Sequence, residues 1–410
     1  MSRAYAPVVL VALATAFSLL GDQMLYSVLP TYHATLGLTY IQVGVILSAN
    51  RWVRFVTNNV AERALHKVNI TVALSLALAA GAGVTALYGV ASNFVVFLLG
   101  RVLWGLCWSF IRQSGLVTAA GVSGEESVGA VMGSYNFIAR LGSVAGNLAG
   151  AIGHDLLGFA RTLFIFSGLS LIAVPLGVRS QRLVTHVRTA GRQERPSFRG
   201  TVGLWLCGFA AGCVGSGLVM STLGLVLRDK VGDSITVVGV VVGVATLNGV
   251  LLSARWIADW SAPVWGAISD RIGRKKAALR YFACGAIALL AGGQAQRPVL
   301  VVACVLVFFV CGTATNVTVL AEAVRRGPRV TASYVTASDM GAAAGPLLGW
   351  AAPEIGLPSS AVFLAGGALY AVAALVAHRS LAGRRADGGP HRPSEARPLD
   401  ASPRTTNSAR

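Results

Sequence analysis

Two residues of opposite charge lie inside long apolar runs of the sequence, at similar distances from the end of a run. Asp22 lies about eight residues before Pro30, and Arg101 lies about eight residues after Asn93. At a rise of 1.5 Å per residue, both are expected roughly 12 Å from the same end of a helix. Ionisable groups inside membrane helices are costly and are therefore functional candidates. A carboxylate at this depth can take up and release a proton.

Further cations lie in the apolar runs of the first half of the chain. Arg51 and Arg54 share one run with the uncharged Asn50, and Arg140 lies in another. With Arg101, they give this half four buried cations against a single buried acid. Such a cavity would attract carboxylates or phosphates.

A structural role is the alternative for these arginines. Arg51, Arg54 and Arg140 would then pair with acids of the second half, such as Asp259 and Asp339, or with helix-end carbonyls. Arg140 and Asp339 occupy matched positions of an internal repeat, and we expect them to pair across the interface of the two halves.

Uncharged side chains extend the expected substrate cavity. Amides inside a membrane can bind a substrate or satisfy one another, and aromatic rings can line a cavity or face neighbouring helices. The full set assigned to the cavity is Asp22, Asn50, Arg51, Arg54, Arg101, Trp104, Gln113, Asn136, Asn248 and Asn316.

The composition indicates an integral membrane protein. The chain has 410 residues, of which 54% are hydrophobic and 12% are charged, and its mean hydropathy is +0.66. About a quarter of residues are charged in an average soluble protein. Apolar runs of roughly 20 residues recur, each long enough to cross a bilayer as a helix.

The net charge of +18 does not indicate nucleic-acid binding, because the arginines lie mainly in short loops and tails. Cations beside apolar spans mark cytoplasmic loops. This pattern predicts a multi-pass protein of the cell membrane with both termini in the cytoplasm.

Twelve spans are expected. They lie near 6–30, 40–61, 69–90, 93–119, 129–152, 160–179, 202–227, 236–262, 278–294, 298–321, 332–352 and 358–378. The domains follow: an N-terminal six-helix half at 1–179, a basic cytoplasmic linker at 180–200, a C-terminal six-helix half at 201–378 and a disordered tail at 379–410. The fold class is therefore an all-α membrane protein.

The two halves repeat each other at a constant offset. Ser134, Tyr135, Gly142, Gly146 and Gly150 match Ser333, Tyr334, Gly341, Gly345 and Gly349. Five matched residues at one offset indicate a duplication.

The segment from Gly266 to Lys276 is a short cationic turn between apolar runs. Its order, Gly-Ala-Ile-Ser-Asp-Arg-Ile-Gly-Arg-Lys-Lys, resembles the signature of the major facilitator superfamily of secondary transporters. The resemblance implies the fold of that superfamily, with two pseudo-symmetric halves of six helices. It also implies that spans one and four are neighbours lining a central cavity.

Arg101-Val-Leu-Trp-Gly105 resembles the span-four pattern whose arginine the superfamily associates with proton coupling, with Trp104 in place of the usual glutamine. We therefore expect Asp22 to carry the proton while Arg101 pairs with it and releases it. A static ion pair that only fixes helix packing is the alternative.

A cytoplasmic gate is expected near the signature. Asp270, Arg274 and Glu322 would form a salt-bridge latch that breaks on inward opening. The residues assigned to this gate are Gly266, Asp270, Arg271, Gly273, Arg274, Lys275 and Glu322. Gly341-x3-Gly345-Pro346-x2-Gly349 is similar to a motif of drug and metabolite antiporters, although it lies in span eleven and not in span five.

These features predict a transporter and not an enzyme. The cysteines and histidines lack metal-ligand spacing, no phosphate-binding loop is present, and neither cofactor nor metal is expected. The leading function is proton-coupled export of a small organic compound by alternating access, performed by a monomer. The alternatives are transport or exchange of an anionic metabolite, with uptake possible, and a non-transporting membrane sensor.

Overall fold

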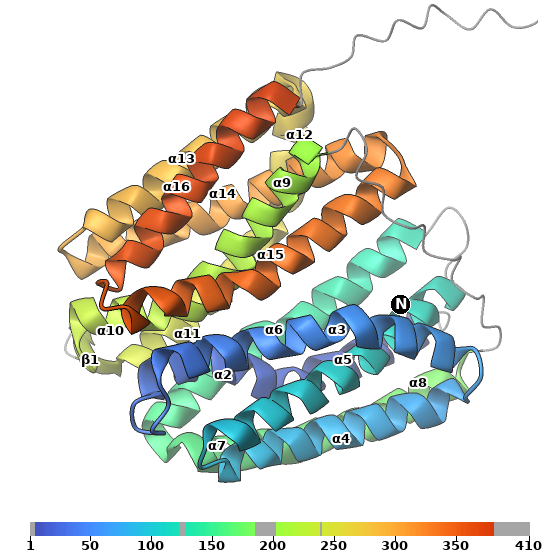
Figure 1. Cartoon of the computed structure of the whole chain (residues 1–410). Coiled ribbons are helices and arrows are strands. Elements are labelled where there is room, and N and C mark those ends of the chain that lie inside the picture. The colour runs from blue at the N-terminus through green and yellow to red at the C-terminus, as the bar shows by residue number, and fades with distance from the viewer. Residues whose placement is uncertain (1–4, 123–127, 185–201, 238–239, 381–410) are drawn as a thin grey trace, which may run out of the picture.

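The structure is a computed structural model that describes residues 5–122, 128–184, 202–237 and 240–380. Figure 1 shows two bundles of helices side by side, the N-terminal half in blue to green and the C-terminal half in yellow-green to red. We call the end of the molecule that carries the β1–β2 hairpin the hairpin end. The opposite end, where α1 begins and α16 finishes, is the termini end.

Within its described residues, the N-terminal half contains six helical rods, two of which are interrupted. The interruptions fall at Leu19 and Ile172, whose backbones stay in the right-handed helical region, so each pair of helices runs on as one rod. The helices are α1 (Ala6–Ser18), α2 (Leu20–Tyr32), α3 (Tyr40–Leu65), α4 (Ile70–Val90), α5 (Phe94–Val122), α6 (Val128–Leu157), α7 (Phe159–Leu171) and α8 (Ala173–Arg182).

The C-terminal half also contains six rods. Its first rod holds a π-helical stretch and its second holds a 3₁₀ turn. The elements are α9 (Val202–Ala211), η2 (Gly212–Val219), α10 (Met220–Val231), β1 (Ser234–Val237), β2 (Val240–Gly243), α11 (Val244–Ala258), η3 (Asp259–Ser261), α12 (Ala262–Ile272), α13 (Arg274–Gln294), α14 (Pro298–Arg325), α15 (Pro328–Glu354) and α16 (Ser360–Ser380).

Seven of the described helical segments are long and apolar enough to cross a membrane, judged by length and composition. The rods α3, α6 and α15 are not among these seven, and they carry Arg51, Arg140 and Asp339. Charges also come from two of the seven apolar segments, which carry Asp22 and Arg101.

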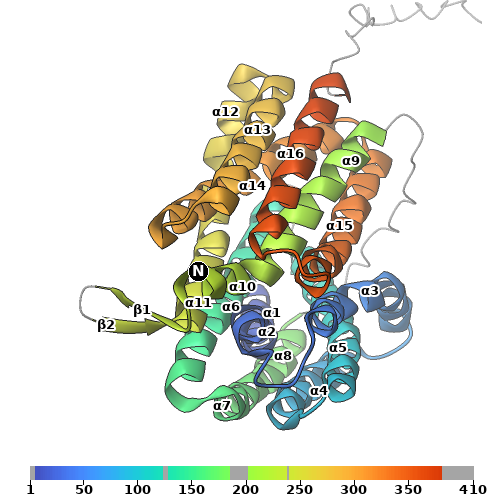
Figure 2. The same cartoon turned by 60° about the vertical axis from the view of Figure 1, so that its left-hand side comes forward.

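The expected eighth span, 236–262, is wrong in position. Ser234–Val237 and Val240–Gly243 pair as two antiparallel strands, which project from the bundle in Figure 2, and the helical rod runs from Val244 to Ile272. The hairpin is rich in valine, a β-branched residue that favours strands. A short apolar run does not by itself separate strand from helix.

The cationic signature is also less of a turn than expected. Its first part is the end of α12, and α13 begins at Arg274. The chain reverses at Gly273 alone, whose φ of 86° is unfavourable for any residue with a Cβ atom. The ninth helix therefore starts four residues before the expected 278.

The boundaries of the N-terminal half and of the last helix need small corrections. The helix α8 continues to Arg182, beyond the expected end at 179, and α16 continues to Ser380. Most of the expected linker, from 185, and the expected tail, from 381, lie outside the described residues.

Matched glycine seams hold the first rod of each half against the fifth. A Cβ atom on Gly142 of α6 would overlap the carbonyl oxygen of Ala16 in α1, and one on Gly341 of α15 would overlap that of Phe209 in α9. Close approach of membrane helices depends on such small residues. The predicted repeat is therefore present in the packing of the backbone.

The two halves are joined at the hairpin end. Arg228 donates to the carbonyl oxygen of Thr31 at 2.6 Å, and Asp155 accepts from the Thr246 hydroxyl at 2.6 Å. Glu354 accepts from the backbone N–H of Ile41 at 3.0 Å. Each of these bonds crosses from one half to the other, so they hold this end of the molecule closed.

Candidate functional site

A cavity of about 380 Å³ lies between the two halves. Its walls come from α1, α2, α3, α5 and α6 of the N-terminal half and from η2, α10, α11, η3, α14 and α15 of the C-terminal half. Of the side chains expected in or beside it, those that line it are Asp22, Asn50, Arg51, Arg54, Trp104, Asn136, Arg140, Asn316 and Asp339.

Three residues assigned to the cavity lie elsewhere. Arg101 is fully buried behind Asp22. Asn248 donates to the carbonyl oxygens of Tyr26 at 3.3 Å and Ser27 at 2.8 Å, so it joins the two halves. Gln113 is not among the residues that line the cavity. Sequence position gave their depth in a span but not the direction in which each side chain points.

Asp22 and Arg101 form an ion pair between α2 and α5, through Oδ1 and Nη1. Arg101 also donates from Nε to the carbonyl oxygen of Ile46 at 3.0 Å and from Nη2 to the hydroxyl of Tyr26 at 3.2 Å. The second carboxylate oxygen of Asp22 accepts from Gln23 at 3.0 Å.

The exposure of the two partners is unequal, since the side chain of Arg101 is 0% exposed and that of Asp22 is 7% exposed. Asp22 borders the cavity, whereas its partner is sealed in the helix bundle. A proton from the cavity can therefore reach the carboxylate. Protonation would leave a buried guanidinium without its counter-charge, which is strongly unfavourable in a low-dielectric site.

Arg51 and Arg54 of α3 face the other half. A capping box of Thr39 and Gln42 fixes the start of α3. Arg51 donates from Nη2 to the carbonyl oxygen of Ser216, within the π-helical stretch η2, at 3.0 Å. Arg54 lies with Asp339 of α15 in a small recess of the interface.

Arg140 and Asp339 do not pair with each other, so that prediction is wrong. The guanidinium of Arg140 stands over the ring of Trp256, 4.0 Å from its centroid. Asp339 lies instead beside Arg54. Both residues do face the opposite half, as expected. They contact different parts of it, however, since Arg140 meets Trp256 of α11 and Asp339 meets Arg54 of α3.

Trp256 belongs to a second charged group, on α11 and η3. Arg255 donates to Asp259 at 2.7 Å, one turn further along the same rod. Asp259 also accepts from the hydroxyl of Thr313 at 2.9 Å. Unlike the Asp22–Arg101 pair, this ion pair joins neighbouring turns of one rod and not two packed helices.

Sequence reasoning missed several lining residues, of which Arg112 is the most important. Arg112 lies eleven residues after Arg101, close to three full turns of a helix. With Trp104 and Trp108, these residues follow a spacing of three, four and four, which puts them on one face of α5. That spacing was available in the sequence.

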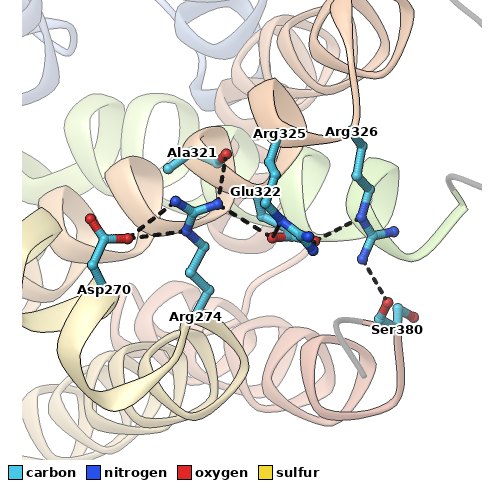
Figure 3. A network of polar contacts seen from close by, with 7 residues as sticks. All are labelled: Asp270, Arg274, Ala321, Glu322, Arg325, Arg326 and Ser380. Atoms are coloured by element: carbon cyan, nitrogen blue, oxygen red, sulfur yellow. Dashed lines mark hydrogen bonds and ion pairs between the residues drawn. The ribbon is translucent and has the colours of Figure 1, made fainter. Parts of the chain in front are cut away.

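The expected gate residues gather at the termini end (Figure 3). Arg274 contacts Asp270 at 3.1 Å and Glu322 at 3.6 Å. Glu322 also accepts from Arg325 at 2.7 Å and Arg326 at 2.8 Å. Three cations thus surround one buried acid.

This cluster does not join the two halves. Arg326 donates to the carbonyl oxygen of Ser380 at 3.2 Å, and Arg274 donates to that of Ala321 at 3.3 Å. For the described residues, these bonds tie α12, α13, α14 and α16 together within the C-terminal half. The rest of the set occupies the same corner: Gly266 packs near Val317, and Lys275 borders a hollow of about 480 Å³ with Gly273. Arg271 is exposed.

Comparisons with known proteins agree with this architecture. The family model of the Major Facilitator Superfamily matches residues 11–262. A helical membrane protein with two six-rod halves around a central polar cavity is a transporter of this type, and the chain belongs to the major facilitator superfamily.

Individual relatives are more distant. The multidrug resistance protein MdtG of Citrobacter koseri is 26% identical over 223 residues. That match spans about half of either chain, 52% of each.

Two solved structures are similar over almost their whole length. The nucleoside transporter NupG has a TM-score of 0.70 at 12% identity, covering 94% of this chain and 100% of that one. A bacterial homologue of the human lysosomal transporter Spinster, in an inward-facing and unoccupied conformation, has a TM-score of 0.72 at 12% identity, covering 93% and 97%. These likenesses show the fold alone.

Proposed function

We propose that this protein is a proton-coupled exporter of a small organic compound, working by alternating access in the cell membrane. The observation that carries the proposal is the Asp22–Arg101 pair, in which the acid borders the cavity and the base is sealed behind it. Alternating access needs a central cavity between two rigid halves, and the cavity described above lies in that position.

In this proposal Asp22 is the proton carrier. When it is ionised, it holds α2 against α5 through Arg101. When it is protonated, the attraction is lost, and Arg101 keeps its hydrogen bonds to the Tyr26 hydroxyl and the Ile46 carbonyl oxygen. The resulting imbalance favours a rearrangement of α2, α3 and α5, which couples proton binding to the exposure of the cavity.

The proposed orientation places the termini end in the cytoplasm. The basic α12–α13 junction and the arginines after α14 lie at that end, and cations beside spans mark the cytoplasmic side. Closure at the hairpin end then corresponds to an inward-facing state. We further propose that a monomer performs the cycle and that the Glu322 cluster keeps the cytoplasmic ends of the C-terminal half moving as one body.

Export is favoured over uptake by the similarity to MdtG, which is a multidrug resistance protein by name. A second candidate is the transport or exchange of an anionic metabolite. It is favoured by the charge of the cavity wall, which carries five arginines against three aspartates. Fields of one sign in a cleft with low-dielectric walls concentrate ligands of the opposite sign.

Flux in proteoliposomes tests the proposal. Ligands are first found by thermal shift of the purified full chain and are then followed as radiolabelled compounds, with and without an imposed pH gradient. We expect the labelled compound to move in the direction opposite to the protons, and this transport should stop when an ionophore collapses the pH gradient. Exchange of an anionic compound at a rate that does not depend on the pH gradient would favour the second candidate. Absence of flux for every ligand that binds would instead indicate a non-transporting sensor.

A further inference from the structure

The arginines of the central cavity divide into two groups. Arg255 is paired with Asp259, and Arg51 donates to a backbone carbonyl oxygen in η2. Arg54, Arg112 and Arg140 line the same cavity, and none of them makes a hydrogen bond or ion pair within 4.0 Å with any residue that the structure describes. For Arg54, the Nε atom is buried and has no partner.

Arg112 lies close enough to the other two guanidinium groups to repel each of them. Arg112 acts electrostatically on both Arg54 and Arg140. Two aspartates act in the opposite direction, since Asp339 lies beside Arg54 and Asp259 attracts Arg140. Guanidinium groups that lack a carboxylate partner in such a cavity gain charge-assisted hydrogen bonds when an anion binds between them.

An aromatic wall adjoins the three arginines. The ring of Trp256 lies under Arg140 at 4.0 Å, and Trp104 and Trp108 stack at 6.2 Å between ring centroids. All three residues border the cavity, although Trp104 is almost fully buried, and the Nε1 atom of Trp256 is a buried donor with no hydrogen-bond partner among the described residues. Flat rings and planar guanidinium groups together favour a flat organic body with a charged end.

We propose that Arg54, Arg112 and Arg140 form the charge-binding subsite for an organic anion, a carboxylate attached to a flat apolar body that lies against Trp256. This rests on the proposed transport function and names the class of its substrate. The cavity of about 380 Å³ falls within the usual range for small-molecule sites. Asp22 and Arg101 stay outside the subsite and remain available for the proton.

The subsite is tested with four probes: naphthoate, its neutral amide, the amine of the same ring, and inorganic phosphate. Binding to the full chain in lipid nanodiscs is followed by calorimetry. We expect naphthoate to bind at least about tenfold more tightly than the amide, because the amide lacks the charge that strengthens hydrogen bonds to guanidinium groups. Amine binding equal to that of naphthoate, or phosphate binding equal to it, would overturn the proposal.

Variants then test which arginines bind the carboxylate of naphthoate. Arg54→Gln, Arg112→Gln and Arg140→Gln should each weaken naphthoate binding by about tenfold while leaving amide binding within about twofold. Arg140→Lys should recover part of the loss, because it restores the charge but not the planar stacking on Trp256. The control is Arg161→Gln, on α7 and away from the cavity, which should change neither value.

The comparison between the carboxylate and the amide uses the unmodified protein, so it remains decisive even if a variant fails to fold. Unchanged naphthoate affinity in all three glutamine variants would overturn the subsite. Loss of this proposal is separable from loss of the proposed function: a protein that exports a cationic or neutral compound with a pH gradient is still the transporter, with another substrate class.

Discussion

The fifth rod of the N-terminal half, α6, and its counterpart in the C-terminal half, α15, pack in the same way but differ in what they present to the cavity. Gly142 and Gly341 occupy matched places and allow equally close approach of the first rod in each half. Two residues earlier on each helix, the matched positions carry Arg140 and Asp339, which are opposite in charge.

The ion pairs beside the cavity differ in a similar way. Asp22 and Arg101 join two helices and are almost completely buried, whereas Arg255 and Asp259 lie on one rod and are 10% and 28% exposed. Backbone packing has therefore been kept in both halves, because small residues are required wherever helices touch. Side chains toward the cavity are not limited to small residues, and the two halves present different charges to it.

The largest expected effect is on proton-driven transport, which should be lost on substitution of Asp22 and kept on substitution of Asp259. Asp22→Asn should reduce proton-driven transport to the level of empty vesicles while sparing counterflow exchange, because the amide cannot take up the proton. Asp259→Asn should still show transport that depends on the pH gradient, whatever its rate. Flux in proteoliposomes with and without the gradient measures both. Driven transport that is unchanged in Asp22→Asn would refute the coupling role.

The stability of the two ion pairs should also differ. Arg101→Met leaves the carboxylate of Asp22 buried without a counter-charge, with only the hydrogen bond from Gln23, and breaking a buried pair costs about 3–5 kcal/mol. Arg255→Met should cost less, about 1 kcal/mol or below, because its pair is partly exposed. Denaturant unfolding of the purified variants in one detergent gives both values. Equal losses of unfolding free energy in the two variants would mean that the two ion pairs contribute equally to stability.

Because the glycine seams are alike in the two halves, substitutions in them should reduce stability by similar amounts. Gly142→Ala and Gly341→Ala each force a methyl group onto a backbone carbonyl of the first rod, and overpacking of this kind costs about 1–3 kcal/mol. Gly133→Ala on the same helix as Gly142 meets open space and serves as the control. It should be neutral or slightly stabilising, since alanine favours helix over glycine. Thermal unfolding midpoints rank the three variants.

The smallest expected effect concerns pH at the hairpin end, where His33 and His154 both belong to the N-terminal half. The ring of His33 packs against Trp350 of the other half at 5.3 Å between centroids. Burial lowers the pKa of His33 below its usual value, and the nearby Arg228 lowers it further, while the Pro30 carbonyl oxygen and Asp229 act in the opposite direction.

A histidine whose pKa is lowered in the folded state stabilises that state above its ordinary pKa of about 6.5 and loses the contribution as the pH falls through the lower value. The thermal midpoint should therefore fall more between neutral and mildly acidic pH in the unmodified protein than in His33→Gln. Equal falls in the two proteins would show that another group titrates.

Much of the fold was predictable because membrane helices leave a strong signal. Long apolar runs, cationic loops and the repeated Ser-Tyr-Gly pattern predicted an all-α protein with two related halves. The eighth span was misplaced because the valines from Val237 to Val242 are as apolar as a helix and yet favour a strand. The rotation of each helix was harder to predict, so Gln113 and Asn248 were placed in a cavity that they do not line.

By itself, the sequence determined the family, the existence and depth of Asp22 and Arg101, and the excess of cations inside the protein, since each follows from the order and kind of residues along one helix. The tertiary structure alone decided the partners. Arg140 meets Trp256 and not Asp339, and Arg274 stays within its own half, because these contacts depend on how separate helices rotate and pack. Among the described residues, that packing left Arg54, Arg112 and Arg140 without a hydrogen bond or ion pair and so defined the proposed anion site.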